Sequence, residues 1–148
     1  MIFIYLKFPK VNLMQKGHVA LIQGVPAKLT DKTVSKTGKH GHAKANMSFV
    51  EFFGTKKIEA SESTSASLDI PILVIKNDPI VQVTEGKDMN NLPEYTVTTN
   101  DAKGVLNTYT ITKEQFTKTD AALKTGKTVN SCITTWRDYV LYDFKIQT

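Results

Sequence analysis

The chain has 148 residues, of which 41% are hydrophobic and 22% are charged, and its formal net charge at pH 7 is +5. This composition is that of an ordinary globular protein, and the length suits one domain or two small β domains. The charge is uneven, because residues 1–71 carry ten lysines against five acidic residues, whereas nine basic residues balance nine acidic ones in residues 72–148. A basic first half favours contact with a polyanion.

The first residues, "MIFIYLKF", are apolar, but the run is too short to span a bilayer and lacks the pattern of a signal peptide. We expect it to form an extra strand or to pack on the body of the protein as an apolar tag. The single cysteine, Cys132, allows no intramolecular disulfide and fits a reducing compartment. Its β-prone surroundings predict a buried structural thiol.

Strand patterns follow along the first half of the chain. An apolar run closed by glycines predicts a strand at 17–24, and β-branched ends predict another at 25–34. In "AKANMSFVEFF", which starts at Ala43, small and apolar residues alternate with polar ones. This period of two predicts a half-buried strand with Ala43, Ala45, Met47 and Phe49 facing inward.

The segment "SKTGKHGHAK" (residues 35–44) lies between two of these strands and contains no side chain that could build a core. It therefore predicts the tip of a β-hairpin. Gly38 and Gly41 can supply the positive φ angles that such a tip needs. Its lysines and histidines form a concentrated cationic tip whose binding to phosphates would weaken with salt.

After this hairpin, residues 53–59 predict a tight turn that leads into a short strand, and the small polar residues 60–67 predict a surface loop. Residues 68–76 resume a strand pattern across Pro71. The basic half ends there, so we expect a first domain over 1–71 that carries the 35–44 loop and a second domain over 72–148.

The second half reads as threonine-rich strands in "IVQVT", "EYTVTT", "NTYTIT" and "TVNSCITTW". One helix is predicted between the last two of these, because Thr112 and Gln115 have capping-box spacing and Gly126 stands where a helix would stop. Phe116 and Leu123 share one face of that helix, with Ala122 beside it. A five-stranded barrel with one late helix is the pattern of the OB-fold.

The motifs of catalysis are missing or incomplete. Gly38 and Lys39 are followed by His40 rather than by a Ser or Thr, so a phosphate-binding P-loop fails. His40 and His42 are two ligands without a Cys, Asp or Glu beside them, which does not complete a zinc site. No serine or cysteine has a recognisable base, and the acidic residues are scattered. We therefore expect no enzyme, no metal and no cofactor.

The ungapped segment "SKTGKHGHAK" resembles the hypusine loop of the translation factor 5A family, the eukaryotic and archaeal relatives of bacterial elongation factor P. The resemblance continues in "KGHVALIQGVPAKL" before the loop and in "VEFFGTKKIE" after it, and it is fainter in "ALKTGKTVNSCITT". The fold that it implies is mostly β, an N-terminal SH3-like barrel followed by a C-terminal OB-fold barrel with one short helix.

The resemblance implies that Lys39 is the lysine converted to hypusine, a covalent modification derived from spermidine by deoxyhypusine synthase and deoxyhypusine hydroxylase. It also implies a cytoplasmic translation factor that binds the ribosome near its exit site, without a membrane. There the modified arm would stabilise peptidyl-tRNA, promote peptide-bond formation at stalling, proline-rich sequences and aid termination. The ribosome- and tRNA-binding residues implied are Ser35, Lys36, Thr37, Gly38, Lys39, His40, Gly41, His42 and Lys44.

The sequence also departs from the family. Ser65 and Ala66 replace the His and Asn of its Ser-Thr-His-Asn segment, so any contact of those two side chains is in doubt. Eukaryotic members usually have a polar, acidic N-terminal tail and are acidic overall, whereas this chain is basic. The alternative function is an unmodified ribosome-associated or general RNA-binding module on the same fold.

Overall fold

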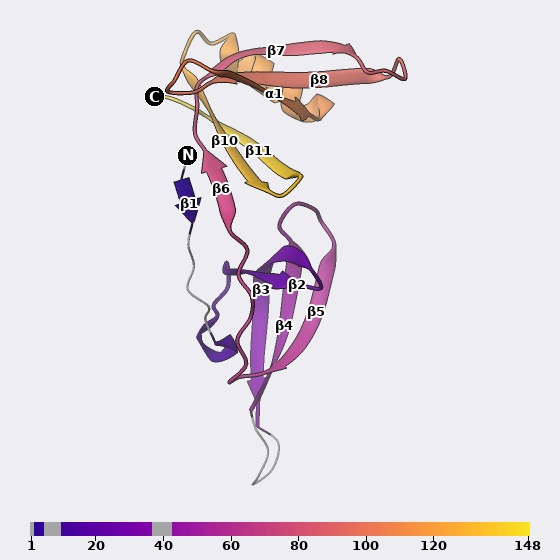
Figure 1. Ribbon diagram of the computed structural model, residues 1–148, viewed down its shortest axis with the longest axis vertical. Helices are drawn as coiled ribbons and strands as arrows, with labels where there is room; N and C mark the ends of the chain where they lie inside the picture. Colours follow the sequence, from indigo (N-terminus) through magenta and orange to yellow (C-terminus); the bar gives the residue numbers. More distant parts are fainter. Residues whose placement is uncertain (1, 5–9, 37–42) are drawn as a thin grey trace. The chain divides into compact units, whose positions relative to one another are not determined.

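The computed structural model describes residues 2–4, 10–36 and 43–148. Contacts between residues divide the chain into two compact units. One is Ile4–Leu73, and the other is Val74–Thr148 together with residues 2–3 at the start of the chain. Each unit is mostly β, and one α-helix lies in the second (Figure 1).

The first unit is built on one antiparallel sheet with the strand order β2-β3-β4-β5. A short 3₁₀ turn, η1 (Val11–Leu13), precedes it. The four strands are β2 (Val19–Ile22), β3 (Val25–Ser35), β4 (Lys44–Glu51) and β5 (Lys57–Ser63). The strands expected at 17–24 and 25–34 are confirmed, because β2 and β3 fall within one or two residues of them.

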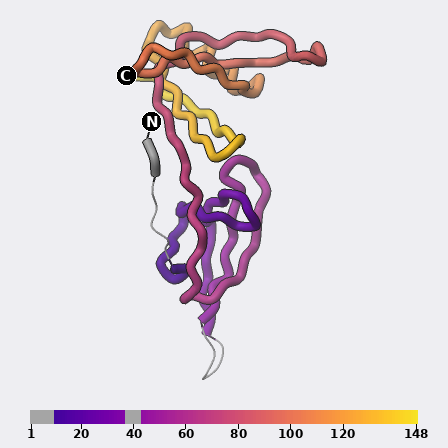
Figure 2. Tube along the Cα trace, in the orientation of Figure 1, coloured from indigo at the N-terminus to yellow at the C-terminus, as the bar shows by residue number. Residues whose placement is uncertain are grey.

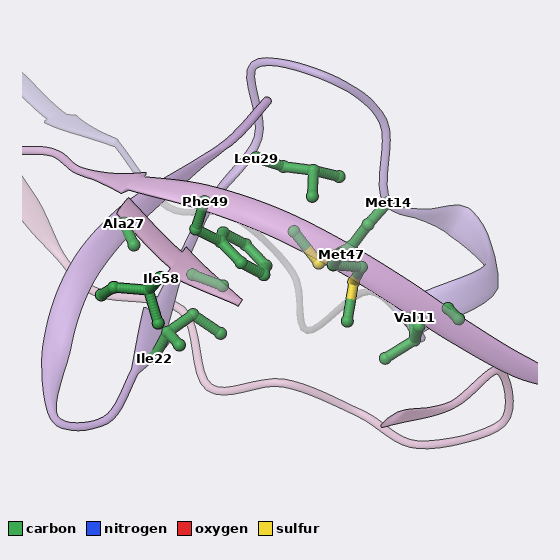
Figure 3. Packing of buried hydrophobic residues seen from close by; sticks show 10 residues of the cluster. Val11, Met14, Ile22, Ala27, Leu29, Met47, Phe49 and Ile58 are labelled. Carbon is green, nitrogen blue, oxygen red and sulfur yellow. The ribbon is translucent and has the colours of Figure 1, made fainter. Parts of the chain in front are cut away.

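The alternation of buried and exposed residues along β4 shows which face of the sheet forms the core of the first unit. Ala45, Met47 and Phe49 are at most 1% exposed, whereas Lys44 and Asn46 are exposed. Their inward row packs with apolar side chains from η1, β2, β3 and β5, as Figure 3 shows. The predicted period of two is therefore confirmed, except that Ala43 precedes the strand and is only half-buried.

Two predictions for residues 60–76 need correction. Residues 60–63 are not loop, because β5 runs to Ser63 and pairs with β4 as far as Ser63↔Lys44. Small hydroxyl side chains suggested a loop, yet they suit the exposed face of an edge strand equally well. Conversely, the strand expected over 68–76 is confined to β6 (Leu73–Lys76).

The second unit contains two sheets, of strand order β1-β6-β10-β11 and β7-β8-β9. Its elements are β1 (Ile2–Ile4), β7 (Ile80–Lys87), β8 (Pro93–Asn100), β9 (Leu106–Ile111), α1 (Lys113–Leu123), β10 (Val129–Trp136) and β11 (Tyr139–Ile146). The chain start therefore adds an edge strand, which was one of the two expected roles. The trace in Figure 2 follows β7 and β8 as a hairpin, in agreement with their register.

The break between β6 and β7 is held by β10. The Ser131 amide and hydroxyl both donate to the carbonyl of Asp78, at 2.8 and 2.7 Å, and Pro79 forms a bridge to Asn130. Successive strands β6 and β7 thus act as one strand that bends from one sheet to the other. With β8, β9, β10 and β11 this gives the five-stranded, partly open barrel of an OB-fold, with α1 between its third and fourth strands.

Candidate functional site

A two-stranded arm carries the predicted site. Strands β3 and β4 pair antiparallel from Ala27↔Glu51 to Ser35↔Lys44, and β5 extends the pairing on the other side of β4 (Figure 1). The last pair closes the base of the connection formed by residues 36–43. The structure thus brings Ser35 and Lys44 together as partners at this base, with Lys36 beside them. The other predicted site residues, at positions 37–42, lie outside the described residues.

A β-bulge decides which side chains of β3 face outward. The register skips Thr30 between Leu29↔Phe49 and Asp31↔Ser48. One extra residue reverses the alternation, so Leu29 is buried on the core face while Asp31 stands on the outer face beside Ser48. The bulge therefore also carries Lys32 to the core face, where its register partner is the buried Met47.

The ammonium group of Lys32 fastens the N-terminal turn to the arm. Its Nζ donates to the carbonyl oxygens of Met14, Val11 and Asn12 at 2.6, 3.2 and 3.3 Å. These three bonds use all the donors of the ammonium. The Val11 carbonyl also accepts the backbone N–H of Met14 at 3.2 Å, so Lys32 adds a second donor to the 3₁₀ turn. Lys32 is thus half-buried, and its ammonium donors are used within the first unit.

Residues 63–66 support the base of the loop from the β5 side. Both the amide and the hydroxyl of Thr64 donate to the Ala43 carbonyl, at 3.1 and 3.3 Å. The Val11 amide donates to Ala66 O at 2.8 Å, and the Ala66 side chain packs against the core. Where the family has His and Asn, this chain places Ser65 in solvent and Ala66 against its core, so the backbone carries the support here.

The cations at the base of the loop are free of ion pairs to described residues. Lys36 and Lys44 are both exposed, and the nearest ion pair along β3 joins Lys16 Nζ to Asp31 at 3.9 Å. An exposed pair of this length contributes little. Lys36 and Lys44 are therefore accessible to solvent, and their binding to phosphate groups stays a prediction.

The part of the chain that the structure describes holds no cluster of three or more potential metal ligands. Cys132 is half-buried rather than buried, because it stands on the face of β10 opposite the inward row of Val129, Ser131 and Ile133. Within the described ranges, no helix is both long and apolar enough to cross a bilayer.

A depression of about 230 Å³ in the second unit is lined by two lysines and two aspartates, Lys76, Asp78, Asp101 and Lys103, with Ala102. Its Asp101 carboxylate accepts backbone N–H bonds from Val105 and Lys103, both at 2.9 Å. These bonds lower the pKa of Asp101, the Val105 bond most, with help from nearby Lys76 and Lys103. Asp101 is thus a turn-forming anion and is not poised to carry a proton.

The family match of this chain lies within its first unit. A family model described as translation initiation factor 5A-like, N-terminal, matches residues 9–66. This match covers the whole arm with its supporting turns. The first domain of the chain is therefore similar to the N-terminal domain of translation initiation factor 5A-like proteins.

Individual relatives agree with that family. The chain is 34% identical to translation initiation factor 5A-1 of Caenorhabditis elegans over 80 residues, which are 53% of this chain and 50% of the relative. It is 35% identical to factor 5A of Dictyostelium discoideum over 82 residues, or 55% of this chain and 52% of the relative. The matched part thus spans about half the length of these curated relatives.

Solved structures extend the likeness to the fold of both domains. A translation initiation factor 5A family protein from Naegleria fowleri matches with a TM-score of 0.72 and 24% identity, over 95% of this chain and 96% of that one. Factor 5A from Methanococcus jannaschii matches with a TM-score of 0.67 and 21% identity, over 95% and 94%. The predicted fold, an SH3-like domain followed by an OB-fold, is therefore confirmed.

Sequence reasoning did not single out two features of this site. One is the Lys32 clamp, since the bulge that turns Lys32 inward has no clear sequence signal. The other is the support of the loop by Thr64, which lies in the turn after β5 and contacts Ala43, a residue distant in the sequence. A Thr or Lys next to strand residues is too common to reveal such contacts by type alone.

Proposed function

We propose that this chain is a translation factor that binds the ribosome near the exit site through the 35–44 loop. Lys39, converted to hypusine, then stabilises peptidyl-tRNA, which promotes peptide-bond formation at proline-rich stalling sequences and aids termination. The observation that carries the proposal is the segment "SKTGKHGHAK". It connects the paired strands β3 and β4 in a domain that matches the 5A-like family model.

The residue types suit this role. Lysine carries one compact cation on a flexible stem, and an added aminobutyl arm lengthens the reach and supplies a second amine. Gly38 and Gly41 flank Lys39 and His40 without bulk, so both a modifying enzyme and a narrow RNA channel could admit the arm. Holding the reactive end of a tRNA in place lowers the entropic cost of peptide-bond formation.

The partners in this proposal are the ribosome, peptidyl-tRNA and the two modifying enzymes, deoxyhypusine synthase and deoxyhypusine hydroxylase. The chain would act in the cytoplasm without catalysing a reaction itself. Lys36 and Lys44 support this view, because they are exposed cations at the base of the loop. Their attraction to RNA phosphates would weaken as salt rises.

The test compares Lys39→Arg with the matched variant Lys36→Arg, both of which keep the charge of the loop. Each chain is co-expressed with the modifying enzymes and added to ribosomes that translate a proline-run template. We expect Lys39→Arg to lose the stimulation by about tenfold or more, equivalent to about 1.4 kcal/mol, and Lys36→Arg to retain most of it. Equal stimulation by wild type and Lys39→Arg would refute a role for the modified arm.

An unmodified RNA-binding module is the second candidate, and the basic first half favours it. In that case, salt-dependent binding to generic RNA would be unchanged by Lys39→Ala, and the modified chain would not stimulate peptide-bond formation.

A further inference from the structure

The outer face of strands β3, β4 and β5 is organised in rows that cross all three strands. The registers of β3 with β4 and of β4 with β5 align one residue from each strand, every second position along β4. We call these rows the neck row, the middle row and the acidic row. They are Ser35–Lys44–Ser63, Thr33–Asn46–Ser61 and Asp31–Ser48–Glu59.

The acidic row and the middle row differ in their side-chain hydrogen bonds. In the acidic row the Ser48 hydroxyl donates to both oxygens of Glu59, at 2.8 and 3.0 Å, so this row is internally satisfied. In the middle row Thr33, Asn46 and Ser61 are all exposed, and their side chains make no hydrogen bond to described residues. Unused donors and acceptors therefore lie next to Lys44, the cation of the neck row.

The face also has a shape that could hold an extended strand. Its side chains are small, and a depression of about 200 Å³ is lined by Asn46, Ala60 and Ser61, with Glu59 of the acidic row as its one charged lining residue. Rows two residues apart are separated by about 6.8 Å, a spacing near that of successive phosphates in an extended single strand. Charge runs from Lys44 at the neck to Asp31 and Glu59 at the far end, where a phosphate would be repelled.

We propose that the middle row is a binding site for the sugar–phosphate backbone of a single RNA strand that passes the neck lysines and stops at the acidic row. Hydroxyl and amide side chains position such a backbone without reading its sequence. The inference rests on the proposed function for the choice of RNA as ligand, and it adds a sheet face of described residues to the predicted loop.

The test measures the anisotropy of a fluorescein-labelled single-stranded RNA with the full, unmodified chain. The middle-row variant is Thr33→Val with Asn46→Ala and Ser61→Ala, and we expect it to bind about fivefold more weakly with an unchanged salt slope. The neck variant, Lys36→Gln with Lys44→Gln, should lower the salt slope by about 1.4, because each phosphate contact on a single strand contributes about 0.7.

Two further variants sharpen the result. Neutralising the acidic row with Asp31→Asn and Glu59→Gln should strengthen binding by about threefold, because it removes repulsion from the next phosphate. The control removes two strand hydroxyls elsewhere, Thr84→Val with Thr96→Val, which bond to each other on β7 and β8. We expect this control to bind RNA as wild type does.

The outcomes separate this inference from the proposed function. If the middle-row variant is folded by circular dichroism and binds RNA like the control, the inference is overturned while the loop proposal stands. If ribosome binding falls in the middle-row variant and RNA binding does not, the face contacts protein, which also overturns it. If wild type binds RNA as described here but the modified chain does not stimulate proline-run translation, only the proposed function fails.

Discussion

Lys32 has a structural role, although lysine side chains usually lie at the surface. Its ammonium contacts three backbone carbonyls, two of which belong to Val11 and Met14, whose side chains are fully buried. Bonds from a charged donor to backbone oxygens are stronger than neutral ones. Removal of the ammonium would leave the Val11 and Met14 carbonyls without this donor.

We therefore predict that Lys32→Met lowers the free energy of unfolding by about 2 kcal/mol, the usual cost of losing bonds to a charged group. The matched control is Lys16→Met, because the exposed ion pair of Lys16 with Asp31 should contribute less than about 0.5 kcal/mol. Urea titrations followed by circular dichroism give both values. Equal stability of the two variants would show that the clamp contributes nothing.

In the second unit, Tyr142 on β11 forms a buried hydrogen bond to Thr119 on α1. Its hydroxyl lies 2.8 Å from the hydroxyl of Thr119, which is fully buried and also donates to Gln115 O at 2.7 Å. Burial raises the pKa of Tyr142 above its ordinary value of 10.0, the bond to Thr119 opposes this rise, and Asp143 adds to it. The folded chain therefore favours the neutral phenol.

The sign of the pH dependence follows from that direction. Because the folded pKa of Tyr142 exceeds the unfolded one, its contribution is complete below pH 10.0 and is lost as the pH rises through the folded pKa. Tyr142→Phe should be less stable than wild type at neutral pH, and the difference should shrink above pH 10.0. Chemical denaturation at a series of pH values measures it, and a difference that stays constant would exclude this coupling.

At the scale of elements, α1 begins where its residues predict. The Thr112 hydroxyl accepts from the Gln115 amide at 3.1 Å, and the Gln115 side chain accepts from the Thr112 amide at 2.9 Å. This completes the predicted capping box. The helix ends at Leu123, and Gly126 adopts a φ of 80° in the turn that follows. Phe116, Ala122 and Leu123 pack on the core as the helical period predicts.

We predict that Thr112→Ala lowers the free energy of unfolding by about 1 kcal/mol, because one capping partner is lost. The control on the same helix is Thr117→Ala, an exposed position where alanine has the higher helix propensity. It should leave stability unchanged or raise it slightly. Thermal unfolding of both variants gives the comparison, and a Thr112→Ala variant as stable as Thr117→Ala would show that the box is not stabilising.

The strands show why patterns predict some elements better than others. The alternation of Ala45, Met47 and Phe49 with polar residues predicted β4 correctly, because one face of this strand is buried and the other is exposed to solvent. The bulge at Thr30 left no such trace, and the reversed face of β3 beyond it follows only from the register with β4. Local sequence specifies turns and periodicity, whereas register depends on a partner that is distant in the chain.

For the whole molecule, the charge and the family match divide the chain in the same way. The basic half carries the loop and matches the 5A-like family model over residues 9–66. The neutral half lies outside that match and has the OB-type fold of the solved structures, to which the chain as a whole is 24% and 21% identical. Its series of strand segments with one helix could be predicted from the sequence, but the bend from β6 to β7 depends on Ser131, which sequence analysis did not single out.

The loop sequence gives the most specific prediction, the modification of Lys39, because an ungapped ten-residue segment is more specific than composition. This stays a prediction. The contacts that hold the base of the loop, from Lys32 and Thr64, depend on the three-dimensional pairing of β3, β4 and β5 and required the structure.

The most direct test of the central claim is mass spectrometry of the peptide that contains Lys39, taken from the chain purified from its natural source. Fragmentation should place the added mass of a hydroxylated aminobutyl arm on Lys39 and leave Lys36 and Lys44 as ordinary lysines. A peptide in which Lys39 is unmodified in every copy would contradict the claim that this loop acts through hypusine.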